Sequence, residues 1–109
     1  MQGVYLKLFV PQTAKHHGKL LSEWILEQAH MIGISGGSAF RAIAGYGRHG
    51  RMHEEHFFEL ADDLPVAVEF VTGEAEAEKL LDILAAEKVS IFYLRQPVEF
   101  GTTFRVELS

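Results

Sequence analysis

At two places in this sequence, a stretch whose apolar residues alternate as in a β-strand is followed by a stretch whose apolar residues recur as in an amphipathic helix. Residues 4–10 alternate, with Val4, Leu6, Leu8 and Val10 on one face, and residues 65–71 (PVAVEFV) alternate in the same way, as in β-strands. Apolar residues recur at steps of three and four over 19–32 and again over 77–84, which predicts two amphipathic helices. These two units restrict the chain to a mixed α and β fold.

Two further strands complete the pattern. Residues 38–46 (SAFRAIAGY) follow a glycine-rich turn, and residues 89–94 (VSIFYL) form the last apolar run. The order strand, helix, strand, strand, helix, strand predicts an α+β ferredoxin-like sandwich, in which an antiparallel sheet carries two helices on one face. We expect a single domain over 1–96, with 97–109 as a C-terminal tail or edge strand. Thr72 is expected to cap the second helix.

The second face of such a sheet has no helix to cover it in a monomer. On this face we expect the side chains of Tyr5, Lys7, Phe9, Arg41, Ile43, Ala67, Glu69 and Val71. This set is too apolar to stay in water, and its charged members can pair with one another. The sequence therefore predicts an oligomer interface, and the alternative is that the C-terminal segment covers the face.

Charge and composition exclude several classes of protein. The 109 residues carry a net charge of −5, which argues against nucleic acid as a partner. No cysteine is present, so disulfides and thiolate metal sites are excluded. No apolar run approaches the roughly 18 residues of a membrane span. We expect a cytoplasmic protein that does not insert into membranes.

The stretch AGYGRHGRMHEEH, over 44–56, has the glycine spacing of a dinucleotide-binding motif. That motif needs a long helix after it, and the segment before Pro65 is too short and too charged to form one. We therefore reject a dinucleotide-binding motif here. Glycines still let a ligand approach the backbone, and Arg48 and Arg51 offer donors suited to phosphate. The alternative is a flexible hairpin with solvated arginines.

Histidines in the same stretch raise the question of a metal. His53 and His56 could ligate zinc or copper, although exposed loop histidines are the favoured reading and a metal is not expected. His16 and His17 precede the first helix, but nothing in the sequence brings them to the other histidines. No nucleophile motif is present, so we do not expect an enzyme.

The segments GISGGSAFRAIAGYGRHG and ADDLPVAVEFVT resemble the PII-like signalling proteins. In these, a run of glycine, aromatic residue, glycine and arginine opens the regulatory T-loop. The segments HGKLL, GRMH and DLPV resemble more specifically the PII-like family known as domain of unknown function one-ninety. This resemblance covers about residues 3–95.

The resemblance implies a homotrimer whose sheets face inward, with an adenine nucleotide or similar small anion in the cleft between subunits. The matching positions at the T-loop base are Gly45, Tyr46, Gly47 and Arg48. Glu69 matches an acidic position on the third strand, and His17, Gly18 and Lys19 match a motif before the first helix.

One departure from the PII pattern affects the ligand. The glycine-rich loop that wraps the phosphates is replaced by AAEKVSIFY, in which Lys88 is the remaining phosphate partner. AMP or ADP is therefore expected rather than ATP, and no cofactor is required. We therefore expect the protein to be a non-enzymatic regulator that signals through the 45–58 loop to a partner such as a membrane transporter or channel. The alternatives are a metal-binding protein and a scaffolding trimer without ligand.

Overall fold

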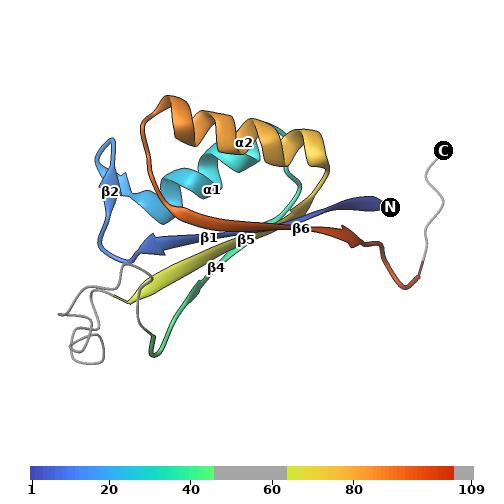
Figure 1. The fold of residues 1–109 in the computed structure, drawn as a ribbon, viewed down its shortest axis with the longest axis horizontal. Helices are drawn as coiled ribbons and strands as arrows, with labels where there is room; N and C mark the ends of the chain where they lie inside the picture. The colour runs from blue at the N-terminus through green and yellow to red at the C-terminus, as the bar shows by residue number, and fades with distance from the viewer. Residues whose placement is uncertain (46–63, 105–109) are drawn as a thin grey trace.

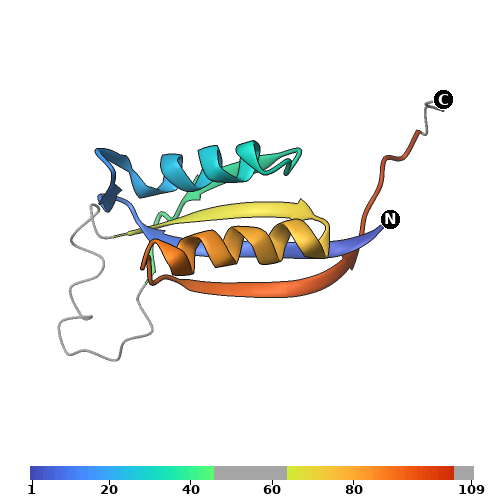
Figure 2. The same ribbon diagram turned by 90° about the horizontal axis from the view of Figure 1, so that it is seen from above.

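The computed structural model describes residues 1–45 and 64–104. These residues form two helices and six strands: β1 (Gln2–Pro11), β2 (Lys15–His16), β3 (Lys19–Leu20), α1 (Leu21–Met31), β4 (Gly37–Arg41), β5 (Pro65–Thr72), α2 (Glu74–Ala86) and β6 (Phe92–Glu99). Figure 1 shows both helices on one side of the main sheet, and Figure 2 shows them side by side, running in opposite directions. Neither helix of the described residues is long and apolar enough to cross a membrane.

The main sheet has the strand order β4-β5-β1-β6, and every neighbouring pair is antiparallel. This is the order of a ferredoxin-like sheet, in which the first and third long strands are central and the second and fourth are at the edges. The predicted fold class is therefore confirmed. A small hairpin of β2 and β3, which we did not predict, is inserted before α1.

The core lies between this sheet and the two helices. The alternation of β1 places four side chains in it, as predicted, and β5 opposes them with Val66, Val68 and Phe70. From the helices come Leu21, Trp24, Ile25, Ala29, Ala77, Leu80 and Leu84. Alternate residues of a strand share a face, and helical residues three or four apart share one too, so these patterns bury one apolar side of each element.

The strand at the C-terminal edge differs from the prediction. We expected it over 89–94, but β6 begins at Phe92 and continues to Glu99, past the domain boundary placed after residue 96. Pro97 lies within β6 opposite Val4. A proline lacks the N–H that a central strand needs, yet an edge strand tolerates it because one side is unpaired. Residues 102–104 are not in a strand, and 105–109 lie outside the described residues.

The predicted cap of the second helix is also wrong. Thr72 is the last residue of β5 and is buried, and Gly73 occupies the cap position without a side-chain hydrogen bond to the helix. Thr72 pairs with Val4, so the alternation of β5 directs its side chain toward the core. Glu74 and Glu76 do lie in the first turn, where the helix dipole favours negative charge.

Candidate functional site

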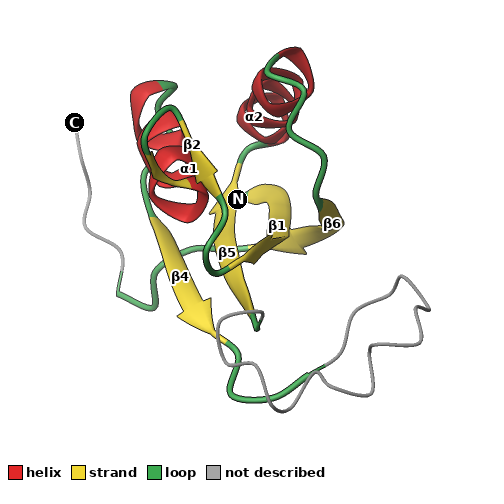
Figure 3. Cartoon of the chain, turned by 90° about the vertical axis from the view of Figure 1, so that its left-hand side faces the viewer, coloured by secondary structure: helices red, strands yellow, loops and turns green. Residues whose placement is uncertain are grey.

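Both helices lie on the same side of the sheet (Figure 3), so no helix of the described residues covers the opposite face. We call this opposite face the open face. The strand registers assign to it Tyr5, Lys7 and Phe9 of β1, Ala67, Glu69 and Val71 of β5, Ser38 and Phe40 of β4, and Phe92, Leu94, Gln96 and Val98 of β6.

Aromatic and aliphatic groups of the open face are exposed to water in the single chain. Phe40 is 55% exposed, Phe92 46% and Val71 42%. The rings of Phe9 and Phe92 stack with centroids 5.4 Å apart, which extends the apolar surface from β1 onto the edge strand. A surface of this composition is typical of a protein interface.

Two residues that we assigned to the open face do not lie there. Arg41 pairs with Val66, whose side chain is in the core, so Arg41 falls on the helix side of the sheet. Ile43 lies beyond the end of β4 and is 95% exposed. Our alternation for this strand was out of phase by one residue, and a shift of one residue moves every side chain to the other face.

The charged residues of the open face interact with one another. The Lys7 amino group lies 3.9 Å from Glu69 Oε2 and 5.2 Å from the centre of the Phe9 ring. Burial raises the pKa of the Tyr5 hydroxyl, and the hydrogen bond and negative charge of Glu69 raise it further. Glu69, which we predicted to bind the ligand, therefore lies in the middle of β5. There it interacts with Lys7 and Tyr5, and apolar side chains of the open face surround these three residues.

Two of the residues that we expected to bind a ligand, Gly45 and Lys88, lie at one end of the molecule. Here β1 and β4 end and β5 and β6 begin, and the β2–β3 hairpin and the C-terminal end of α2 lie beside them (Figure 1). We call it the loop end. Gly45 lies shortly after β4, and Lys88 follows α2. The other predicted residues of the 45–58 loop lie outside the described residues: Tyr46, Gly47, Arg48, Arg51, His53 and His56.

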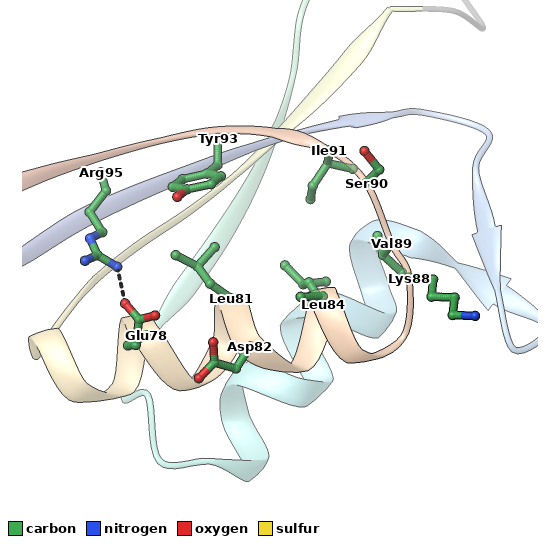
Figure 4. A pocket seen from close by; sticks show the side chains of 11 residues that line it. Glu78, Leu81, Asp82, Leu84, Lys88, Val89, Ser90, Ile91, Tyr93 and Arg95 are labelled. Atoms are coloured by element: carbon green, nitrogen blue, oxygen red, sulfur yellow. Dashed lines mark hydrogen bonds and ion pairs between the residues drawn. The ribbon is translucent and has the colours of Figure 1, made fainter.

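A groove of about 820 Å³ runs between α2 and β6. Lys88 lies at one end of the groove and Arg95 at the other (Figure 4). Arg95 Nη1 donates a hydrogen bond to Glu78 Oε1 over 2.8 Å, and this bond raises the pKa of the guanidinium. Among the described residues, the Lys88 amino group has no hydrogen-bond or ion-pair partner. Lys88 is therefore the cation of the groove that remains available to an anion.

A cluster of two histidines and a glutamate, which the sequence did not reveal, also lies at the loop end. Glu87 Oε1 is 2.9 Å from His16 Nε2 and 3.0 Å from His17 Nε2. These two hydrogen bonds hold the pKa of the Glu87 carboxyl below its ordinary value. Within the described ranges, this is the one group of three such side chains close enough to share a metal ion.

Solved structures with the same fold belong to PII-like proteins. One is the apo form of CPII from Thiomonas intermedia K12, a nitrogen regulatory PII-like protein. The match covers 94% of our chain and 95% of that one, with a TM-score of 0.60 and 15% identity. A second is CPII bound to ADP and bicarbonate, at a TM-score of 0.61 and 19% identity over 94% and 91% of the two chains. At these identities the likeness establishes a shared fold.

Relatives with higher sequence identity are UPF0166 proteins. The one from Aquifex aeolicus is 31% identical over 97 residues, which cover 82% of our chain and 92% of the relative. The one from Methanocaldococcus jannaschii is 33% identical over 76 residues, or 70% and 69% of the two chains. The profile of the DUF190 family, described as "Uncharacterized ACR, COG1993", matches residues 3–100. The chain therefore belongs to this family, and it has a PII-like fold.

Proposed function

We propose that this protein is a non-enzymatic PII-like regulator that works as a homotrimer. An adenine nucleotide or similar small anion binds at the loop end, in a cleft between subunits, and changes the 45–58 loop. The observation that carries this proposal is a sheet with an exposed apolar face in a fold shared with a PII-like nitrogen regulatory protein. We further propose that the loop acts in the cytoplasm on a membrane transporter or channel.

The open face supports assembly. Exposed phenylalanines on β4 and β6 flank the central strands, and the charges of Lys7 and Glu69 face each other between them. Burial of such a surface is favourable by about 25 cal/mol for each Å² of apolar area. Because the charges already have partners within the chain, their burial leaves fewer groups unsatisfied.

The loop end supports the choice of ligand. The CPII structure with ADP and bicarbonate shows that a protein of this fold can hold a nucleotide and a small anion. In our chain the cations that we propose for this role are Lys88 and, from the sequence, Arg48 and Arg51. A nucleotide can act as a signal only if it binds one arrangement of the 45–58 loop more tightly than another.

Nucleotides should raise the temperature of unfolding of the wild-type protein. A ligand at about 100 times its Kd stabilises a native protein by about 2.7 kcal/mol. We expect ADP or AMP to give such a shift, and ATP a smaller one, because the glycine-rich phosphate loop is missing. The measurement is thermal unfolding with AMP, ADP and ATP, each with and without magnesium.

The variants Arg48→Gln and Lys88→Gln should lose most of that shift and keep the unfolding temperature of the free protein. Lys79→Gln is the matched control, because Lys79 is an exposed cation of α2 outside the groove. If none of the nucleotides raises the unfolding temperature of the wild-type protein, the scaffolding trimer without ligand is favoured. Full shifts in both variants would show that these cations do not bind the nucleotide.

A further inference from the structure

We propose that His16, His17 and Glu87 form a binding site for a divalent transition metal, with zinc as the first candidate. The two imidazoles and the carboxylate supply three ligand atoms that lie within 4.8 Å of one another. This site differs from the one considered at His53 and His56, and it does not depend on nucleotide binding. Its residues lie in the β2–β3 hairpin and at the C-terminal end of α2.

The hairpin explains how two consecutive residues reach the same partner. Successive side chains of an extended strand point to opposite sides, so His16 and His17 could not share a ligand on a regular strand. His17 and Gly18, however, form the two-residue loop between β2 and β3, and both have positive φ, at 53° and 81°. This tight turn brings the rings of His16 and His17 together, with centroids 4.2 Å apart.

The ligand groups are held in place by structured parts of the chain. The ring of His16 packs edge-on against Trp24, with centroids 4.3 Å apart, and Trp24 is in the core. Glu87 is the C-cap residue of α2, and its N–H donates to Ile83 O over 3.0 Å. Binding a cation therefore requires little ordering of the backbone around these two ligands, which favours affinity.

The two nitrogen–oxygen distances of the cluster are close to those of a tetrahedral metal site. Zinc binds nitrogen and oxygen at about 2.0–2.2 Å, which places tetrahedral ligand atoms roughly 3.3 Å apart. The two nitrogens of the cluster are 2.9 and 3.0 Å from Glu87 Oε1. All three ligand atoms lie within 4.8 Å of one another, so adjustments of the side chains alone would admit the ion, which would take the place of the two hydrogen bonds between the nitrogens and the carboxylate. Each ring would then carry its proton on Nδ1.

Two imidazoles and one carboxylate suit zinc, copper or nickel better than magnesium or calcium, which prefer oxygen ligands. The side chain of His17 is 63% exposed, so the cluster opens to water, which can take the fourth position of the ion. A bound ion would join the β2–β3 hairpin to the end of α2, directly before Lys88. The metal would thus fix the segment that begins the groove.

The test is calorimetric titration of metal-free, untagged protein with zinc chloride at neutral pH, with magnesium chloride as the comparison. We expect one zinc ion per chain and no magnesium binding. Glu87→Gln and His17→Asn should each weaken zinc binding at least tenfold; asparagine is chosen because it tolerates positive φ. His30→Ala, which alters an exposed histidine of α1, should bind as the wild type does.

A second control separates the cluster from the other histidines of the sequence. The triple variant H49A/H53A/H56A should keep the zinc affinity of the wild type. In the wild type, zinc should also shift the ¹⁵N resonances of Nε2 in His16 and His17, which needs no variant to fold. The proposal is overturned if the wild type binds no zinc, if Glu87→Gln and His17→Asn bind it as tightly as the wild type, or if those resonances do not move.

Discussion

Phe40→Glu is expected to convert the proposed trimer into folded monomers. Phe40 is on the edge strand β4, on the open face, and more than half of it is exposed in the single chain, so the substitution places no charge in the core. In an assembly that buries the open face, the new carboxylate would lose its water. An unpaired buried charge costs about 3 kcal/mol or more per subunit, which weakens association roughly a hundredfold for each interface.

Light scattering coupled to size-exclusion chromatography measures the mass in solution, and circular dichroism checks that the variant is folded. Val71→Glu, on the neighbouring strand of the open face, should have the same effect. Met31→Glu is the matched control, because Met31 is a 74% exposed apolar residue at the end of α1, on the helix side. Trimers of Phe40→Glu and Val71→Glu, or monomers of Met31→Glu, would show that the interface lies elsewhere.

Leu80→Ala is expected to destabilise the fold by about 3 kcal/mol, because it removes a fully buried side chain that α2 packs against the sheet. The loss has two parts: the transfer free energy of the missing methyl groups and the cavity that the rigid core leaves open. Leu80 is flanked on α2 by the buried residues Ala77 and Leu84, which are spaced to share its face and cannot move to fill the space.

Urea unfolding at one fixed protein concentration measures this loss, since the stability of an oligomer depends on concentration. Lys79→Ala is the control on the same helix: Lys79 is exposed, and alanine is a good helix former, so the free energy of unfolding should change by less than about 0.5 kcal/mol. A loss below 1 kcal/mol for Leu80→Ala would mean that α2 is not packed as described.

The central strands could be predicted closely from the sequence, whereas the edge strands could not. In β1 and β5, aliphatic or aromatic core residues recur at every second position, and each strand carries one charged residue between them, Lys7 in β1 and Glu69 in β5; Pro11 and Pro65 mark their paired ends. The segment SAFRAIAGY, of which β4 contains the first four residues, has apolar residues in both phases, so the face of this strand was predicted wrongly. Edge strands bury less of their surface, and their sequences carry a weaker periodic signal.

The candidate site was predictable only in part. Gly45 and Lys88 were predicted from the sequence as ligand-binding residues; the structure places both at the loop end, and their role in binding stays a prediction. The cluster of His16, His17 and Glu87 was missed because about 70 residues separate its members, and only the packing of the hairpin against the end of α2 joins them. The one local signal was the dipeptide His17-Gly18, which lies between the two-residue strands β2 and β3 and suits a two-residue hairpin loop.

Calorimetric titration with ADP of the wild type and of Phe40→Glu tests the central claim most directly, because a ligand site between subunits requires both ADP binding and assembly. We predict one ADP bound per chain in the wild type and at least a tenfold loss of affinity in the monomeric variant, whose own half of the cleft is unchanged. Absence of binding to the wild type at millimolar ADP, or equal affinity in the monomer, would contradict the account.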